Sequence, residues 1–269
     1  MSYENVIWEL EGAVGRLTLN RPASLNAWTG EMERAYFALL EECADSEQVR
    51  VIVVTGAGRG FCAGADMQEL QAIGNGDVQA AAEAHERRPQ TFPLSIPKPI
   101  IAAINGPCAG IGLVQALMCD LRFGAEGAKL TTAFARRGLV AEHGISWLLP
   151  RLVGPARALD LLLSARVLLA EEAERLGLVN RVLAPELLLE ETLAYARDLA
   201  VNCSPSSMAT MKRQVYSALE QDLSQALAEA DGLMLESFTA PDFVEGVTSF
   251  LERRDPRFAP LAGKAALTG

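Results

Sequence analysis

The chain has 269 residues, of which 50% are hydrophobic and 22% charged, a balance typical of a globular protein with one large core. Its net charge of −10 argues against nucleic acid and against anionic membrane surfaces as partners, because both are bound through basic faces. The five cysteines form no CxxC pair and the two histidines are too few for a histidine-based zinc site, so we expect reduced thiols, a cytoplasmic location and no metal centre.

The first part of the chain alternates predicted strands with one helix. Alternating apolar and polar residues predict strands over 5–10 and 13–19, separated by a hairpin turn. Thr29 then stands where a helix N-cap is expected, and an apolar stripe at helical spacing follows it. The stripe consists of Met32, Ala35, Tyr36, Leu39 and Leu40. The continuous apolar run 51–54 suits a strand that is buried on both faces.

Two strand-loop-helix units come next. The first strand leads into a glycine-rich loop, 56–66, and an alanine-rich stretch, 67–92, predicts helices broken near residues 74–76. The second strand, 99–104, leads into another glycine loop and a helix that ends near Met118, before a further strand over 119–123. Cys62-Ala63-Gly64-Ala65 and Cys108-Ala109-Gly110-Ile111 occupy equivalent places in the two units, 46 residues apart. Such a repeat predicts successive turns of a β/α spiral.

The last third of the chain is predicted to be mostly helical. The helical spacing of apolar residues covers 159–163, 171–176, 185–199, 205–219 and 223–235, with a break before a further helix at Pro241. We therefore divide the chain into a core, 1–200, and a C-terminal helical cap or association region, 201–269. The polar first residues and the absence of a long apolar run predict neither a secretory leader nor a membrane-spanning helix.

The two glycine loops favour binding of negative charge. Helices that follow such loops present unpaired N–H groups at their first turn, which suits a phosphate or a developing oxyanion. The sequence has no P-loop motif, and the dinucleotide fingerprint that begins at Gly56-Ala57-Gly58 is interrupted by Phe61. The phosphate motifs therefore fit poorly.

Short motifs distributed over nearly the whole chain point to one protein family. They are Asn20-Arg21-Pro22 with Leu25-Asn26-Ala27, the loop 60–66, the strand 98–106, Cys119-Asp120, 147–151 with Gly154, and Glu245-Gly246-Val247 with Phe250-Leu251. In this order they resemble the signatures of the crotonase superfamily, the enoyl-CoA hydratase/isomerase family. The resemblance implies an α/β fold, with a crotonase-like β/α spiral core and a C-terminal helical region. It also implies assembly as homotrimers or dimers of trimers.

The resemblance further implies an oxyanion hole made by the backbone N–H groups of Ala65 and Ile111. These donors would hold the thioester oxygen of an acyl-CoA as it becomes an enolate. Coenzyme A enters as part of the substrate, so no separate cofactor is expected. Ile111 departs from the family pattern, which commonly has glycine at this place.

The acidic residues indicate which reaction is catalysed. The family's hydratases carry two glutamates, at places that correspond to Val114 and Phe134 in this chain. A two-glutamate hydration is therefore not expected. Glu142 stands eight positions after Phe134, an arrangement that resembles the family's Δ3,Δ2-enoyl-CoA isomerases, with a helix-capping acid as the alternative interpretation. We expect Glu142 to carry a proton from C2 to C4 of an enoyl-CoA.

The two histidines carry separate predictions. His143 is predicted to orient Glu142 or to act as a base, or else to bond to the backbone. His85 is expected to be a solvated helix residue.

The remaining candidate residues concern substrate binding. By the resemblance, Arg21, Ala23, Ala63 and Asp66 lie along the adenine or pantetheine path, and Asp66 is also a predicted structural cap. Lys212 and Arg253 are candidates for contacts with the phosphates of coenzyme A, reached from a neighbouring subunit, with exposed surface charge as the alternative.

Three other functions stay open at this point. Glu142 and His143 also suit hydratase, ring-isomerase or hydrolase chemistry on the same scaffold. The empty positions 114 and 134 permit an acyl-CoA-binding protein without catalysis. A dinucleotide oxidoreductase is the weakest alternative.

Overall fold

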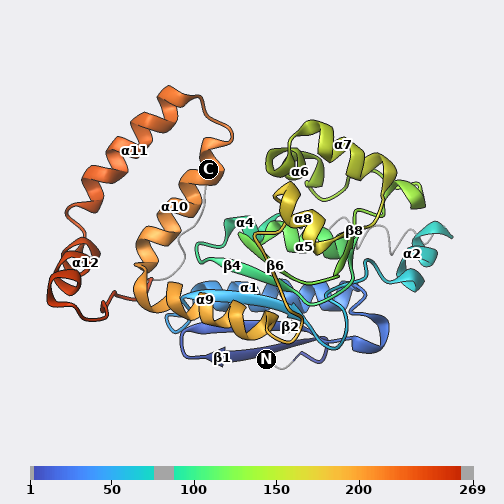
Figure 1. Ribbon diagram of the computed structural model, residues 1–269, viewed down its shortest axis with the longest axis horizontal. Helices are drawn as coiled ribbons and strands as arrows, with labels where there is room; N and C mark the ends of the chain where they lie inside the picture. The colour runs from blue at the N-terminus through green and yellow to red at the C-terminus, as the bar shows by residue number, and fades with distance from the viewer. Residues whose placement is uncertain (1–2, 76–87, 262–269) are drawn as a thin grey trace.

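A central β-sheet organises the molecule. The computed structural model describes residues 3–75 and 88–261. Its main sheet has six strands in the order β1-β2-β3-β4-β6-β9 (Figure 1). The strands are β1 (Val6–Glu11), β2 (Val14–Leu19), β3 (Val51–Gly56), β4 (Ile100–Ile104), β6 (Leu121–Ala125) and β9 (Arg181–Leu183). β1 and β2 form the predicted antiparallel hairpin, and the later neighbours in the sheet pair in parallel.

Helices cover the sheet where its sequence is continuously apolar. Every residue of β3 and β4 is buried, as the apolar runs predict. Helix α1 (Gly30–Asp45) packs against β1 and β2, and its cap is the predicted Thr29, whose side chain accepts the N–H of Met32 at 3.1 Å. Helix α9 (Leu188–Asn202) crosses β2, β3, β4 and β6. The loops at the carboxyl ends of β3 and β4 are therefore the expected place for a ligand.

A second, three-stranded sheet completes the spiral. Its order is β5-β7-β8, with β5 (Cys108–Ala109), β7 (Lys129–Thr131) and β8 (Leu168–Leu169). Helix α5 (Ile111–Met118) follows β5 and is buried along its whole length. An isolated parallel bridge joins Cys62 to Cys108, so the two Cys-Ala-Gly loops lie side by side. The predicted repeat is confirmed, and with it the α/β spiral core.

Shorter elements fill the layer around the two glycine loops. They are the 3-10 helices η1 (Pro22–Ser24) and η2 (Ala135–Arg137) and the helices α2 (Met67–Gly74), α4 (Phe92–Ser95), α6 (Ile145–Val153), α7 (Pro155–Ser164) and α8 (Ala170–Leu176). The predicted break near residue 74 coincides with the end of α2. Residues 76–87, with His85, lie outside the described residues.

The last helices form an arm, which we define as residues 205–252. It consists of α10 (Pro205–Ala218), α11 (Leu223–Ser237) and α12 (Pro241–Glu252), and in Figure 1 α11 and α12 stand apart from the sheets. The predicted helices of this region are confirmed, whereas the division at residue 200 stays a prediction. In the described part of the chain no helix combines the length and the apolar composition needed to cross a bilayer.

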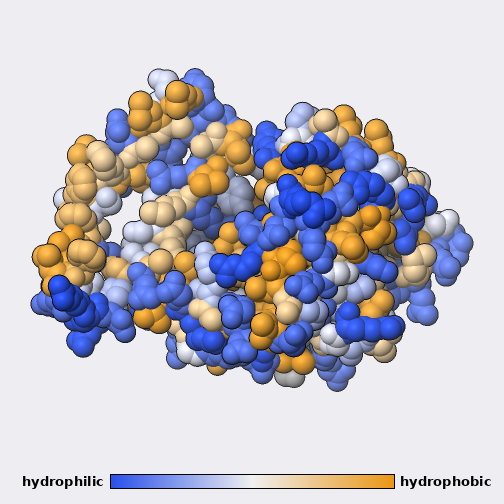
Figure 2. All heavy atoms as spheres, viewed as in Figure 1, coloured by the Kyte–Doolittle hydropathy of each residue, from blue (hydrophilic) through white to orange (hydrophobic). Residues whose placement is uncertain are grey.

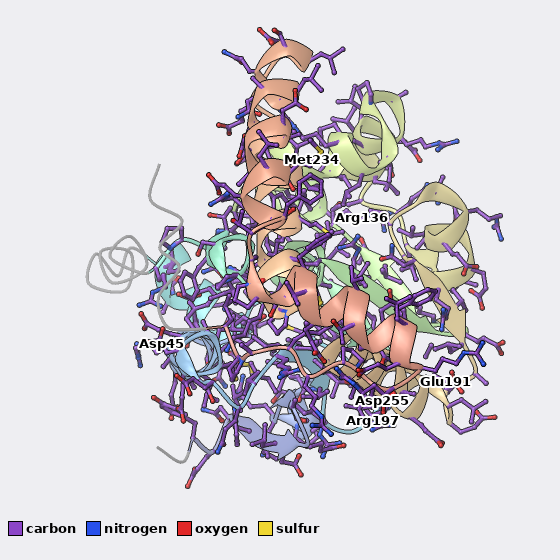
Figure 3. The ribbon with its side chains drawn as sticks, turned by 90° about the vertical axis from the view of Figure 1, so that its left-hand side faces the viewer. Asp45, Arg136, Glu191, Arg197, Met234 and Asp255 are labelled. Atoms are coloured by element: carbon purple, nitrogen blue, oxygen red, sulfur yellow. The ribbon has the colours of Figure 1, made fainter. Side chains whose placement is uncertain are left out.

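Two cations hold the C-terminal part of the chain to the core. The Lys212 ammonium on α10 donates to Asp120 at 2.8 Å and to the carbonyls of Pro93 and Lys98, each at 3.2 Å. Arg50, just before β3, donates to the carbonyl of Ala200 at 3.0 Å and to that of Phe258 at 2.6 Å. The chain thus returns from α12 to the core, and Figure 3 labels Asp255 on this return.

The arm exposes many apolar side chains, which Figure 2 shows along α11 and α12. Among the most exposed are Met211, Val215, Leu223, Leu227, Leu235, Val244, Phe250 and Leu251. Phe250 is 83% exposed, far above the level expected of a large aromatic side chain in a finished assembly.

Candidate active site

A cavity of about 690 Å³ opens where the loops after β3 and β4 meet. This volume lies in the range of small-molecule sites. Eight of the predicted site residues line the cavity. They are Arg21, Ala63, Ala65, Asp66, Ile111, Phe134, Glu142 and His143. The structure thus brings together residues that are up to 122 positions apart in the sequence.

Asn26 fixes the first loop. It is fully buried and has a φ of 56°, a left-handed conformation that asparagine tolerates better than most residues. Its Nδ2 donates to the carbonyls of Ala57 at 3.0 Å and Gly60 at 2.8 Å, and its Oδ1 accepts the N–H of Arg21 at 2.8 Å. The segment 20–27 therefore acts as a clamp on the loop that carries Ala65.

The second loop packs against the first through glycine. A Cβ atom on Gly112 would lie 2.3 Å from the carbonyl oxygen of Cys62, a distance that only glycine avoids. Ala109 N–H donates to the same carbonyl at 3.0 Å. The start of α5 is thereby held directly over the first loop.

The peptide group of Ala65 is oriented by its neighbours. Trp28 N–H donates to Gly64 O at 2.8 Å, and Asp66 N–H donates to Trp28 O at 2.9 Å. Since successive peptide groups point in alternate directions along an extended chain, the N–H of Ala65 faces away from Trp28. Within residues 3–75 and 88–261, this N–H has no protein acceptor.

Ile111 is the first residue of α5. Its N-cap is Gly110, with a φ of 50° and a ψ of −123°, and no side chain caps the helix. The Ile111 N–H likewise meets no protein acceptor in the described chain. First-turn N–H groups carry the positive end of the helix dipole. Ala65 and Ile111 therefore supply two backbone donors to one cavity, which suits a developing oxyanion.

Glu142 and His143 stand just before α6. Glu142 Oε2 lies 3.3 Å from His143 Nε2, and the two side chains are 31% and 37% exposed. Burial lowers the pKa of His143 below its ordinary value, although Glu142 and Glu33 act in the opposite direction. The imidazole is therefore neutral near pH 7, and a neutral ring can donate one hydrogen bond to the carboxylate.

The two positions that hold glutamates in the family's hydratases are apolar and differ in their placement. Phe134 is 5% exposed and forms part of the cavity wall, at the start of η2. Val114 is fully buried in α5 and is not among the residues that line the cavity. Neither side chain can move a proton.

The mouth of the cavity carries an ion pair. Arg21 lies 3.0 Å from Asp66 and also donates to the carbonyl of Ala27 at 2.6 Å. Asp66 caps α2 by accepting the N–H of Gln68 at 3.0 Å, as predicted. Although partial burial acts against it, these hydrogen bonds and Arg21 lower the pKa of Asp66. Ala23 is exposed in η1 beside this mouth, and its contact with coenzyme A stays a prediction.

Lys212 lies away from the cavity, and its phosphate contact stays a prediction. Its ammonium is 7% exposed and its three hydrogen bonds lie at the amino end of β4, whereas the cavity lies at the carboxyl ends of the strands. An ammonium has three protons, so the hydrogen bonds occupy them all. Lys212 therefore holds α10 to the core. Arg253 is exposed at the end of α12 and does not line the cavity, and its phosphate contact stays a prediction.

The sequence analysis missed a buried polar network in the cavity wall. Glu33 of α1 is 3% exposed, and its Oε2 accepts Trp28 Nε1 at 3.0 Å and Gln90 Nε2 at 2.7 Å. Gln115 Nε2 in turn donates to Gln90 Oε1 at 2.5 Å. One signal was available, because Glu33 lies at helical spacing from Tyr36 and Leu40 on the apolar stripe.

Comparisons with known proteins agree with this geometry. The family model described as enoyl-CoA hydratase/isomerase matches residues 9–260. A probable enoyl-CoA hydratase from Rhizobium meliloti (strain 1021) is 37% identical over 258 residues, which cover 96% of this chain and 99% of that protein. A 1,2-epoxyphenylacetyl-CoA isomerase from Escherichia coli (strain K12) is 36% identical over 259 residues, with coverage of 95% and 98%. The crystal structure of an enoyl-CoA hydratase from Bacillus anthracis matches with a TM-score of 0.87 at 29% identity, covering 95% of this chain and 99% of that one.

The β/α spiral, with its two glycine loops bridged at Cys62 and Cys108, has the crotonase fold of the solved structures that it matches. With the match over residues 9–260, the chain belongs to the enoyl-CoA hydratase/isomerase family.

Proposed function

We propose that the protein is an enoyl-CoA isomerase that moves a double bond from C3 to C2 of an acyl-CoA thioester, with Glu142 as the only proton carrier. The observation that carries this proposal is the composition of the cavity. Glu142 shares it with Ala65 and Ile111, while Val114 and Phe134 replace the glutamates of a hydratase.

The reaction begins with proton removal. The Glu142 carboxylate takes a proton from C2 of a 3-enoyl thioester, and the electron pair moves onto the thioester oxygen. The N–H groups of Ala65 and Ile111 stabilise this oxygen, each by about 3 to 4 kcal/mol in the transition state. The double bond then forms between C2 and C3 as Glu142 returns the proton to C4. Water is not consumed and no electrons are lost, so the reaction balances with the thioester alone.

The test compares wild type with Glu142→Gln in D₂O, using a 3-enoyl-CoA and analysis of the product by mass spectrometry. Wild type should form 2-enoyl-CoA with less than one deuterium per turnover, because one carboxylic acid carries the same proton from C2 to C4. Glu142→Gln should reduce kcat by about 10² to 10⁴, the usual contribution of a positioned base. Binding of a saturated acyl-CoA should be unchanged.

Glu126→Gln is the matched control, because Glu126 is exposed and does not line the cavity. It should retain wild-type turnover. A wild-type protein that binds acyl-CoA but converts no 3-enoyl-CoA would refute the isomerase and favour a binding protein.

Ring isomerisation is a second candidate. It is favoured by the 36% identity to a 1,2-epoxyphenylacetyl-CoA isomerase and by the aromatic side chains of Trp28 and Phe134 in the cavity wall. Turnover of an epoxyphenylacetyl-CoA, lost in Glu142→Gln, would support it. Water addition to a 2-enoyl-CoA at a comparable rate would instead support a hydratase that uses Glu142 with His143.

The assembly and location of the enzyme are part of the same proposal. The exposed apolar side chains of the arm are suited to cover a second copy of the chain, in a homotrimer or a dimer of trimers. The five free cysteines, four of them buried, suit a cytoplasmic enzyme.

A further inference from the structure

One guanidinium in the cavity wall has almost no partner within the described part of the chain. The arginine and acidic residues that line the cavity are Arg21, Glu33, Asp66, Glu69, Arg137 and Glu142. Five of these side chains have a hydrogen bond or an ion pair at 3.3 Å or less. Arg137 is the exception among the described residues, because its guanidinium makes a single hydrogen bond, from Nη1 to the carbonyl of Ala133 at 3.4 Å.

The guanidinium of Arg137 therefore has donors to offer to a ligand. A guanidinium carries five N–H groups, and the contact with Ala133 is longer than the usual range of about 2.7 to 3.2 Å. Arg137 is exposed, so water satisfies its remaining donors. A ligand oxygen can replace this water without breaking a hydrogen bond of the protein. The planar fork of the guanidinium matches the two oxygens of a carboxylate.

The 3-10 helix η2 places Arg137 in the cavity wall. Its N–H donates to the carbonyl of Phe134 at 2.9 Å, which closes one turn. Residues three apart on a 3-10 helix lie on the same side, and Phe134 and Arg137 both line the cavity. At about 2.0 Å per residue, Arg137 lies about 6 Å beyond Phe134 along the helix axis.

This part of the wall also contains the proposed proton carrier. The cavity residues of the segment 133–143 are Ala133, Phe134, Arg137, Leu139, Glu142 and His143. In the proposed function Glu142 acts on C2 and C4, so the acyl chain lies beside this segment. The other guanidinium of the cavity, that of Arg21, is held by Asp66 and the carbonyl of Ala27. Arg137 is therefore the guanidinium left for a negative group on the acyl chain.

We infer that Arg137 binds a carboxylate on the acyl chain, so that the substrate is the coenzyme A thioester of a dicarboxylic acid rather than of a plain fatty acid. This inference rests on the proposed function in taking the acyl group to lie beside Glu142. It does not depend on whether the double bond then moves.

Titration calorimetry with saturated thioesters measures this preference, because these ligands cannot undergo the isomerisation. ω-Carboxyacyl-CoAs with six to ten acyl carbons are each compared with their ω-methyl esters, which keep the chain and remove the charge. At the best length, wild type should bind the free acid about 5-fold more tightly, the upper end for an ion pair that is open to water. Added salt should reduce this preference, since it screens exposed charges.

Three variants localise the preference. Arg137→Met should bind the methyl ester more tightly than the free acid, because Asp66 and Glu142 then repel the carboxylate without compensation. Arg137→Lys, which keeps the charge without the planar fork, should retain part of the preference. Arg136→Met is the matched control, since Arg136 is exposed on the same helix, donates to the carbonyl of Ser164 at 3.2 Å and does not line the cavity. It should bind both ligands as wild type does.

The outcomes separate this inference from the proposed reaction. Equal affinity of wild type for acid and ester at every length would overturn the role of Arg137. Weakening of acid and ester by the same factor in Arg137→Met would also overturn it, because Arg137 would then hold a phosphate of coenzyme A. A carboxylate preference that Arg137→Met removes, in a protein without isomerase activity, would support Arg137 and refute the reaction. Failure of every acyl-CoA to bind would refute both.

Discussion

His143 combines an unusual backbone with a titratable ring. Its φ is 59°, in the left-handed region that few residues other than glycine and asparagine occupy readily. This conformation places Nε2 3.3 Å from the Glu142 carboxylate. Burial is the main cause of its lowered pKa. The chain thus keeps a neutral ring next to the proposed proton carrier.

The lowered pKa of His143 predicts how stability depends on pH. Between the folded value and the ordinary value of about 6.5, the unfolded chain binds a proton that the folded protein does not. Stability is therefore complete above about pH 6.5 and falls as the pH decreases through this window. His143→Asn, which tolerates the same backbone, should lose less stability than wild type between about pH 7.5 and pH 5.

Two measurements check the His143 prediction. Denaturant unfolding of both proteins across this range gives the difference directly, because the other titrating groups are common to the pair. NMR titration in a His85→Gln background, which leaves His143 as the single histidine, should give an imidazole pKa below 6.5. A value above 6.5 would contradict the burial argument.

At the scale of elements, α5 depends on its contact with the first glycine loop. All eight of its residues are buried, and Gly112 has no room for a Cβ atom beside the Cys62 carbonyl. Backbone lies on both sides of this contact, so neither side can adapt without moving a loop of the site.

Gly112→Ala should therefore destabilise the protein by about 1 to 3 kcal/mol, as overpacking does, and reduce kcat by moving Ile111 relative to Ala65. Gly232→Ala is the control, since Gly232 in α11 has open space around its Cα and alanine favours helix. Calorimetry and steady-state kinetics measure the two effects. Wild-type stability and kcat in Gly112→Ala would show that the loop contact is looser than described.

The elements that could be predicted from sequence were those with a strong local pattern. The continuous apolar runs predicted β3 and β4, and the Thr29 cap with its stripe predicted α1. The strands β5, β8 and β9 have two or three residues, too few for a periodic signal, and they form only because other strands present an edge to them.

The residues of the site likewise differ in whether a local sequence pattern reveals them. Ala65, Ile111 and Glu142 could be predicted because they lie within or beside recognisable motifs. Glu33 could not be assigned a role, because its importance depends on contacts with Gln90, 57 positions away, and on a cavity formed by other segments. The acceptors of the Lys212 ammonium could not be predicted for the related reason that they lie 92 to 119 positions away in the sequence.

At the scale of the whole molecule, the arm determines the proposed assembly. Phe250 and Leu251 are 83% and 75% exposed on α12, and the other exposed apolar side chains continue along α10 and α11. Phe250→Glu should raise the concentration at which the oligomer dissociates by about 10- to 100-fold, because a charge would enter an apolar interface.

Light scattering coupled to size-exclusion chromatography checks this prediction. Wild type should have the mass of three or six chains. Leu163→Glu, which places the same charge at an exposed leucine of α7, is the control and should leave the mass unchanged. A monomeric wild type would contradict the proposed assembly.

Arg50 is synthesised long before Phe258, whose carbonyl accepts its hydrogen bond. Its acceptor at Phe258 follows 208 residues later, whereas the central sheet is complete once β9 ends at Leu183. A ribosome that adds about 5 to 20 residues per second delivers Phe258 roughly 10 to 40 s after Arg50. During that interval the guanidinium lacks its acceptor at Phe258, so this contact next to β3 forms only after the central sheet is complete.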